Sequence, residues 1–157
     1  MAVSNVTTLR KSAGVFHRHF TSDPAVVAGV LASLGEAFQE FCLHEDVISS
    51  IEIVLSEVIN NINEHAYRGA VDGPVELHAA IDGRDVLFRI VDSGIGMPGG
   101  KIPARMAADV TGPLAQLPEG GFGWCLIHDL AHDLSYFREK GENRFSFRVT
   151  IDGAVAS

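Results

Sequence analysis

Residues 45–67 read EDVISSIEIVLSEVINNINEHAY, and this stretch carries the strongest structural signal in the chain. Its apolar residues recur at spacings of three and four, which is the period of one face of an α-helix. The residues of this apolar face are Val47, Ile51, Val54, Leu55, Val58, Ile59 and Ile62. The spacing predicts a helix from about Glu45 to Tyr67, with Gly69 as its stop.

The same predicted helix carries a polar line on the side away from its apolar face. At 100° per residue, a sector of about 60° holds the side chains of Glu57, Asn61, Glu64 and Arg68. A solvated helix face is the ordinary explanation for such a line. Three asparagines within residues 60–63 lower the helix propensity, however, which indicates another role. A carboxylate and a carboxamide one turn apart offer a proton acceptor and a hard oxygen ligand for Mg²⁺.

The patterns on either side of this helix predict the remaining elements. Asp23 and Pro24 are typical of a helix start, and they open a helix that runs to about Cys42. A third helix begins in the turn Gly121–Gly123 and runs to about His132. Alternating residues and turn signals predict strands over 15–21, 75–82, 85–92, 133–139 and 143–151. The long loop from Gly94 to Gly121 holds a short possible helix near Ala104 to Asp109.

This order of elements predicts the fold class. Strand, two helices, two strands, loop, helix and two strands fit an α+β two-layer sandwich, in which about three helices cover one face of a mixed, mostly antiparallel sheet. The 157 residues fit one domain, 1–157, of which we expect residues 1–13 to be a flexible N-terminus.

Composition and charge limit the partners and the cellular compartment that we expect for this chain. Because the net charge is −8 and no cluster of basic residues is present, we do not expect direct binding to nucleic acid. No apolar run of about 18 residues predicts a membrane span, and residues 1–12 lack a secretory signal, so we expect a cytoplasmic protein without membrane contact. Cys42 and Cys125 form no metal or disulfide pattern and receive no chemical role.

Two glycine-rich stretches follow the central helix. Residues 91–98 read VDSGIGMP, in which an apolar strand ends on Asp92 and glycines follow at alternate positions. A carboxylate there can accept a hydrogen bond from an exocyclic amine, although a tight turn after a strand gives the same pattern. Residues 119–127 read EGGFGWCLI, and glycines that lead into a helix suit phosphate oxygens or simply form a flexible loop end. Neither stretch is a P-loop or a Rossmann fingerprint.

Taken in order, three short motifs resemble the ATP-binding boxes of the gyrase, histidine-kinase and MutL superfamily. They are Glu57-x-x-x-Asn61 with His65-Ala66-Tyr67, then Asp92-x-Gly94-x-Gly96, then Gly121-x-Gly123. The small size and the His-Ala-Tyr ending of the helix resemble the anti-sigma-factor serine kinases within that superfamily. The resemblance covers roughly residues 14–151, and it implies a histidine-kinase-like ATPase domain of the Bergerat type.

The resemblance also implies roles for residues. Glu57 would be the general base on a partner's serine hydroxyl, Asn61 would hold Mg²⁺, and Asp92 would bind the adenine amine of ATP. The pocket and an ATP lid over 97–120 would be shaped by Gly94, Gly96, Gly121 and Gly123, and the nucleotide contacts would include Met97 and Phe122. Further phosphate contact is assigned to Arg68, Lys101 and Arg105, for which solvated surface charge is the alternative. His65 either contacts a phosphate or caps the helix end.

The implied function is ATP-dependent phosphorylation of a serine in a small STAS-type anti-anti-sigma antagonist, combined with binding of a sigma factor or related regulator. The alternatives are a non-catalytic ATP-binding clamp and a histidine-kinase-like catalytic fragment that acts on a partner; a homodimer is a family expectation. Trp124 and Cys125 depart from the family pattern, which implies a changed adenine side of the pocket. His128 and His132 lie at a metal-chelating spacing, and His17 and His19 fit two polar surface residues of one strand.

Overall fold

The computed structural model describes residues 13–105 and 121–151. In chain order its elements are β1 (Ala13–Thr21), α1 (Pro24–Glu40), α2 (Glu45–Asn61), a π-helical turn (Ile62–Ala66), β2 (Pro74–Asp82), β3 (Asp85–Asp92), a 3₁₀ turn (Pro98–Gly100), α3 (Gly121–Leu130), β4 (His132–Glu139) and β5 (Glu142–Thr150). Every predicted strand and all three predicted long helices are present, with boundaries that differ by a few residues. Of the expected flexible N-terminus, residue 13 already belongs to β1, and residues 1–12 lie outside the described ranges.

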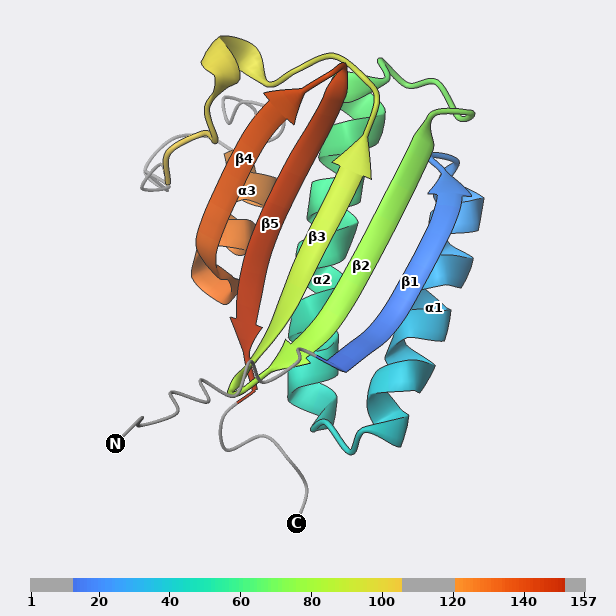
Figure 1. Cartoon of the computed structure of the whole chain (residues 1–157), viewed down its shortest axis with the longest axis vertical. Coiled ribbons are helices and arrows are strands. Elements are labelled where there is room, and N and C mark those ends of the chain that lie inside the picture. Colours follow the sequence, from blue (N-terminus) through green and yellow to red (C-terminus); the bar gives the residue numbers. More distant parts are fainter. Residues whose placement is uncertain (1–12, 106–120, 152–157) are drawn as a thin grey trace, which may run out of the picture.

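The five strands form one sheet in the order β1-β2-β3-β5-β4, as Figure 1 shows. Each neighbouring pair is antiparallel. The predicted α+β class is confirmed, but the mixed sheet is a correction: β3 and β4 run in the same direction without touching, because β5 lies between them. The chain crosses from β3 to the sheet edge through α3 and then returns through β5 beside β3.

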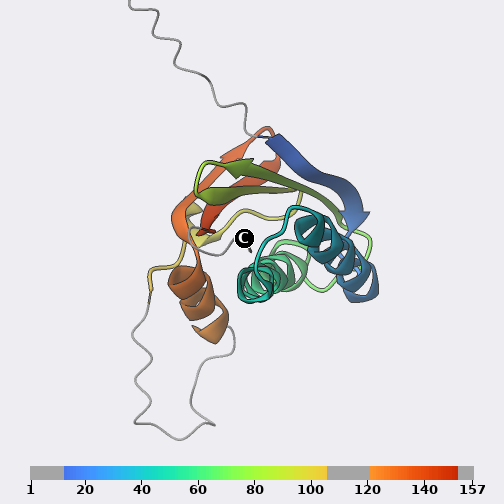
Figure 2. The same ribbon diagram turned by 90° about the horizontal axis from the view of Figure 1, so that it is seen from below.

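The helices α1, α2 and α3 cover one face of the sheet, and no described element covers the other face (Figure 2). The core fills the space between the two layers, and its centre is made of aromatic rings. Phe88 stacks on Phe147 with ring centroids 5.0 Å apart, and Phe38 from α1 meets Phe88 edge-on at 6.1 Å. In β5 the side chains alternate between buried and half-buried, as expected for a strand with one face on the core.

Local sequence signals explain most of the helix boundaries, but three predictions about helices need correction. α1 begins as predicted, since the Asp23 carboxylate accepts a hydrogen bond from the Ala25 amide at 2.9 Å. It ends at Glu40 rather than Cys42, because Cys42 has a left-handed backbone with φ 60°. α3 ends at Leu130 rather than His132, where β4 already begins. Of the predicted short helix near residues 104–109, residues 104 and 105 are not helical, and residues 106–109 lie outside the described ranges.

No helix within residues 13–105 and 121–151 is both long enough and apolar enough to cross a bilayer.

Candidate functional site

A cavity of about 370 Å³ lies where the end of α2 meets the end of β3, the loop after it and α3. This volume is in the range of small-molecule sites. Six of the residues predicted to bind a nucleotide line it: Asn61, His65, Arg68, Asp92, Gly96 and Met97. The other lining residues are Val58, Ile62, Ala66, Ile95, Pro98, Pro103, Trp124, Tyr136, Asn143 and Phe145. The cavity therefore joins polar groups from α2 and β3 to walls that are largely apolar.

Asn61, the last residue of α2, presents an unsatisfied amide. Its Nδ2 atom is buried and has no hydrogen-bond partner among the described residues. Buried side-chain polar groups in folded proteins are almost always paired, so an unpaired carboxamide at a cavity wall indicates a ligand-binding role. If the Asn61 amide group is turned by 180°, its oxygen takes the place of Nδ2. The same position can then offer an acceptor instead of a donor.

A π-helical turn over Ile62–Ala66 follows α2, where the sequence predicts continuous α-helix to Tyr67. This prediction was wrong, and the neighbouring contacts give the reason. Asn63 donates from Nδ2 to the carbonyls of Ser22 at 3.0 Å and Ala70 at 3.2 Å, which ties the widened turn to the segments beside it. The Ala66 carbonyl is thereby free to accept the Ile95 amide at 2.9 Å. Turns of this kind occur often at functional sites.

Asp92, at the end of β3, is 6% exposed. Its Oδ1 atom accepts hydrogen bonds from the Gly94 amide at 2.9 Å and from Asn143 Nδ2 at 2.8 Å. Burial raises the pKa of the Asp92 carboxyl, while those two hydrogen bonds and the charge of Arg138 oppose the rise. Oδ2 receives no hydrogen bond from any described residue, which leaves one acceptor for a ligand.

Asn143 on β5 is the hub of this network. Its Nδ2 also donates to the carbonyls of Gly94 at 3.2 Å and Ile95 at 3.0 Å. Its Oδ1 accepts from Tyr136 Oη and from Arg138 Nη1, both at 2.7 Å. Tyr136 Oη in turn accepts the Met97 amide at 2.9 Å. β4 and β5 thereby fix both the carboxylate of Asp92 and the backbone of the glycine loop.

Gly94 is required by close packing against the end of the π-helical turn. A Cβ atom at Gly94 would lie 2.5 Å from the Ala66 carbonyl oxygen, closer than side chains approach backbone atoms. At Gly96 the nearest atoms to such a Cβ are Arg138 Cδ at 3.1 Å and Tyr136 Oη at 3.3 Å. Gly94 therefore permits the loop to sit on the end of the π-helical turn, and Gly96 faces the cavity itself.

Glu57 does not line the cavity. Its carboxylate faces the first turn of α3, where a Cβ atom at Gly123 would lie 2.6 Å from Glu57 Oε2. Gly123 is buried, so the absence of a side chain there makes room for the carboxylate. Gly121 is the first residue of α3, and the predictions for the side chain of Phe122 and for residues 106–120 lie outside the described part of the chain.

The model of the histidine kinase-like ATPase domain family matches residues 20–149 of this chain. The chain belongs to this family. The match spans the elements that build the cavity, from the end of β1 through α2 and β3 to β5. The predicted resemblance to histidine-kinase-like ATPases is confirmed.

Curated relatives of this ATPase-family chain include serine-protein kinases. The serine-protein kinase RsbW of Bacillus cereus (strain AH820) is 27% identical over 116 residues, which are 73% of this chain and 68% of that protein. RsbW of Bacillus anthracis (strain A0248) matches with the same figures. Among solved structures, the histidine kinase domain of the Erythrobacter litoralis EL346 blue-light activated histidine kinase is 17% identical with a TM-score of 0.48, and the match covers 80% of this chain and 61% of that chain. The Acinetobacter baumannii histidine kinase AdeS is 15% identical with a TM-score of 0.46, with 87% of this chain and 68% of that chain covered.

Sequence reasoning about this ATPase domain missed the residues on β4 and β5. Tyr136, Arg138 and Asn143 lie about 40 or more positions from the glycine loop that they hold. No local pattern identifies them, since Asn143 follows Lys140-Gly141 and looks like an ordinary turn residue. The signal that could have found Asn143 is the strand register, which pairs it with Asp92, and this register is a product of the assembled sheet.

The other predicted candidates are not gathered at the cavity. Arg105 forms an ion pair with Asp129 on α3, and Lys101 is exposed. His128 Nε2 hydrogen-bonds to the Pro103 carbonyl oxygen at 2.8 Å, whereas His132 Nε2 is 3.1 Å from Asp85 Oδ1. These two histidines point to different partners, and neither belongs to a cluster of three metal-ligating side chains within the described ranges.

Proposed function

We propose that this chain binds ATP with Mg²⁺ in the 370 Å³ cavity and transfers the γ-phosphoryl group to a serine of a small STAS-type antagonist protein, and that it also binds a sigma factor or related regulator. The observation that carries the proposal is the convergence of an unpaired Asn61 amide and a buried Asp92 carboxylate on one cavity. The 27% identity to RsbW serine-protein kinases supports the choice of serine as acceptor.

The donor set of the cavity fits Mg²⁺ held through a nucleotide. Mg²⁺ prefers oxygen ligands, keeps several waters, and takes one or two protein ligands beside the phosphates. The Asn61 side chain, whose Nδ2 position has no partner among the described residues, would offer one hard amide oxygen there after a 180° flip of the amide. When bound, the metal neutralises charge on the phosphates during transfer. His65 and Arg68, which also line the cavity, complete the set of groups from the α2 end that contact phosphate.

Asp92 is suited to recognise the base. An adenine offers its exocyclic N–H₂ as a donor, and Asp92 Oδ2 is the acceptor that remains after Gly94 and Asn143 have occupied Oδ1. Val58, Met97 and Phe145 supply apolar wall for the ring. A buried acceptor that loses its partner costs about 1–3 kcal/mol, so a base without this donor is rejected.

Glu57 is the proposed general base. The hydroxyl oxygen of the acceptor serine attacks the γ-phosphorus, its proton goes to the Glu57 carboxylate, and the bond between the γ-phosphorus and the bridging oxygen breaks to release ADP. The approach of Glu57 Oε2 to Gly123 supports this role, because it sets the carboxylate beside the N-terminal turn of α3, where phosphate oxygens are favoured.

A second function, an ATP-binding clamp without phosphoryl transfer, is favoured by one observation. Glu57 is absent from the cavity lining and borders a groove between α1 and α2 instead. In that function the nucleotide controls binding of the regulator, and no phosphoserine forms. The two functions share every cavity contact and differ only in the use of Glu57.

Nucleotide binding is tested by isothermal titration of Mg²⁺-ATP into the wild type, Asn61→Ala and Asn60→Ala. Asn60 is the matched control, since it is exposed and does not line the cavity. Asn61→Ala should weaken binding at least about tenfold. The variant loses one contact between the Asn61 side chain and the charged Mg²⁺-ATP, and such a contact contributes about 1.5–3 kcal/mol. Asn60→Ala should bind as the wild type does. If both variants bound Mg²⁺-ATP with equal affinity, Asn61 would not be a nucleotide-binding residue. If the wild type did not bind Mg²⁺-ATP, the proposal of a nucleotide site would be wrong.

Phosphoryl transfer is tested with γ-labelled ATP and candidate antagonists from the source organism. Glu57→Gln keeps the size of the side chain and removes the base, so transfer should fall by a factor of about 10²–10⁴. Nucleotide affinity and binding of the regulator should stay at the wild-type level. Phosphoserine formed at the wild-type rate by Glu57→Gln contradicts the base assignment, whereas no phosphoserine with either protein selects the clamp.

A further inference from the structure

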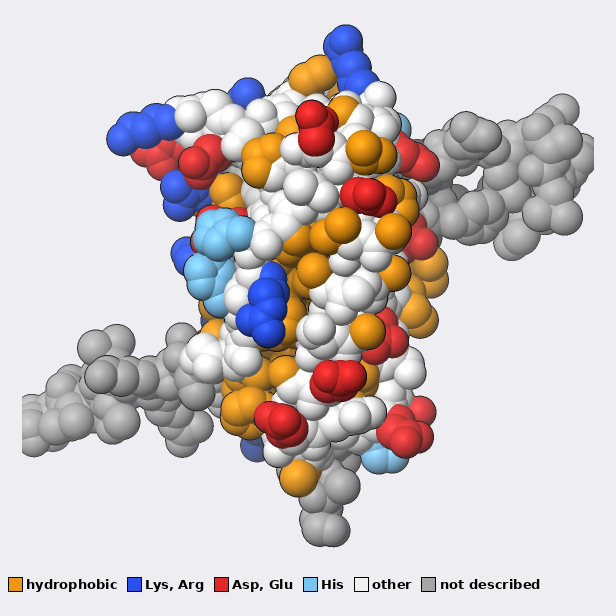
Figure 3. Space-filling model, turned by 90° about the vertical axis from the view of Figure 1, so that its right-hand side faces the viewer, with side chains coloured by type: hydrophobic (Ala, Val, Ile, Leu, Met, Phe, Trp, Pro, Cys, Tyr) orange, Lys and Arg blue, Asp and Glu red, His pale blue; other side chains and the backbone are white. Residues whose placement is uncertain are grey.

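The open face of the sheet carries a cluster of histidines that the nucleotide site does not use. His17 and His19 lie on β1 two residues apart, and the antiparallel register pairs them with His78 and Glu76 on β2. Side chains at positions i and i+2 of a strand point to the same face. Four metal-ligating side chains therefore form a square on the sheet face opposite the helices. Figure 3, which views the β1 edge, shows histidine side chains gathered at the surface on the left.

Three members of this square already converge on one point. Glu76 Oε1 accepts a hydrogen bond from His17 Nε2 at 2.9 Å and from His78 Nε2 at 2.5 Å. The two imidazoles are stacked with centroids 4.0 Å apart and an interplanar angle of 14°. One ligand atom from each of the three residues lies within 4.8 Å of the others. His19 stands next to them, with its Nε2 3.9 Å from Glu76 Oε1.

We propose that His17, His78 and Glu76 bind a Zn²⁺ ion on the open face of the sheet, with the fourth position taken by His19 or by water. Two imidazole nitrogens and a carboxylate oxygen are a recurrent ligand set for zinc with an open position. Ligand atoms around tetrahedral zinc lie about 3.3 Å apart for bonds of about 2.0–2.1 Å. The present separations, 2.9 and 2.5 Å from Glu76 Oε1 to the two imidazole nitrogens and at most 4.8 Å within the group, bracket that value.

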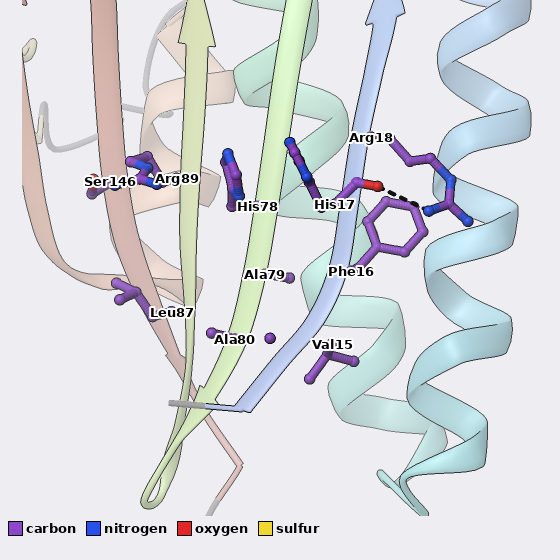
Figure 4. Close-up of a pocket in the computed structure, with 11 residues that line it drawn as sticks. Val15, Phe16, His17, Arg18, His78, Ala79, Ala80, Leu87, Arg89 and Ser146 are labelled. Carbon is purple, nitrogen blue, oxygen red and sulfur yellow. Dashed lines mark hydrogen bonds between the residues drawn. The ribbon is translucent and has the colours of Figure 1, made fainter. Parts of the chain in front are cut away.

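The electrostatics of the cluster suit a divalent cation. Glu76 places a carboxylate oxygen, Oε1, 2.9 Å from His17 Nε2 and 2.5 Å from His78 Nε2, so an acidic group stands between the two imidazoles. Arg89 lies opposite His78 on β3. Figure 4 shows His17 and His78 side by side above the sheet, with Arg89 and Ser146 farther along the same row. They share a surface hollow of about 620 Å³, which gives an ion access.

A metal at this position would join β1, an edge strand, to β2. Binding to the folded state alone raises stability by mass action, so saturating Zn²⁺ should raise the unfolding temperature of the protein. Since imidazole nitrogens attract zinc and Mg²⁺ prefers oxygens, Mg²⁺ should not produce this shift through the cluster. The zinc site is thus separable from the Mg²⁺ of the nucleotide cavity.

The test uses the untagged full-length chain, stripped with a chelator and titrated with Zn²⁺ by calorimetry and with Co²⁺ by visible absorption. His17→Gln/His78→Gln removes two ligands. The matched control is His44→Asn, which removes an exposed histidine 3.6 Å from the carboxylate of Asp46 and keeps a good N-cap for α2. Loss of even an indirect partner of a metal ligand typically costs about 10–100-fold in affinity, so the double variant should bind at least about tenfold more weakly.

The wild type and His44→Asn should bind one Zn²⁺ with the same affinity at this site, give the absorption of tetrahedral Co²⁺, and unfold at a higher temperature with zinc. The double variant should lose all three responses. If it unfolds without metal, Glu76→Gln replaces it as the test variant. No saturable Zn²⁺ binding to the wild type, or equal binding by the wild type and the cluster variants, would overturn the proposal.

Discussion

Replacement of Asn143 by alanine removes the hub that joins β5 to the glycine loop. The side chain makes its 2.8 Å hydrogen bond to a buried carboxylate, Asp92, and donates to two backbone carbonyls as well. In Asn143→Ala the Asp92 carboxylate keeps only the Gly94 amide among its described donors. A hydrogen bond to a charged group contributes about 1.5–3 kcal/mol and one to a neutral group about 1 kcal/mol, so we expect a loss of about 3 kcal/mol in unfolding free energy.

The pH dependence of this loss has a definite sign. The pKa of Asp92 is already raised by burial, and Asn143 opposes the rise. Without Asn143 the folded-state pKa of Asp92 rises further. For an acid with a raised folded pKa, stability is highest where the group is protonated and decreases as pH rises from the unfolded pKa to the folded one. The penalty of Asn143→Ala should therefore be smallest near pH 4 and below, close to the ordinary pKa of an aspartate of about 3.9, and largest near neutrality.

The assay is urea unfolding of the wild type, Asn143→Ala, Asp92→Asn and the double variant, at neutral and acid pH. With a slope of about 1–3 kcal/mol/M, the single Asn143 variant should unfold about 1–3 M earlier. Because Asp92→Asn keeps an acceptor oxygen and removes the charge, the cycle isolates the charge-dependent part of the interaction, and residues in direct contact typically couple by about 0.5–3 kcal/mol. The role assigned to this hydrogen bond would be refuted if Asn143→Ala carried the same penalty in the wild-type and Asp92→Asn backgrounds, and the same penalty at both pH values.

Two further predictions address packing and ligand occupancy. Gly94→Ala should lower the unfolding free energy by about 1–3 kcal/mol, because the new Cβ meets the Ala66 carbonyl at 2.5 Å; Gly29→Ala, with open space on α1, should be neutral or stabilising by up to about 1 kcal/mol in the same urea assay. Trp124 is the one tryptophan of the chain and lines the cavity, so Mg²⁺-ATP should change its fluorescence. Calorimetric ATP binding with an unchanged emission spectrum would show that the nucleotide lies elsewhere.

Much of the fold follows from local patterns. The four-residue spacing of Ile51, Leu55 and Ile59 indicates a helix regardless of what the helix packs against, and the alternation along 75–82 and 85–92 indicates strands with one buried face. The Asp-Gly turn between those strands fixes their pairing, since a short hairpin can close only one way. The resemblance of the ordered motifs to ATP-binding boxes implied that Asn61, Asp92 and Gly96 belong to one site, and all three line the same cavity.

The parts that escaped prediction depend on contacts between distant segments. The π-helical turn is stabilised by Asn63 bonds to Ser22 and Ala70, which helix propensity cannot anticipate. The position of Glu57 outside the cavity lining depends on where α3 packs. His17 and His19 looked like two polar surface residues, and only their register with β2 adds His78 and Glu76.

The sequence by itself therefore determined the elements, the α+β class and the family resemblance, because backbone periodicity and glycine turns are encoded within a few residues. Tertiary structure alone decided which distant side chains meet. The strand register pairs Asp92 with Asn143, 51 positions along the chain, and His17 with the still more distant His78. A shift of one residue would turn these side chains to opposite faces of the sheet. The buried core that fixes this register is a property of the whole chain, so the hydrogen-bond hub and the histidine cluster become visible only after folding.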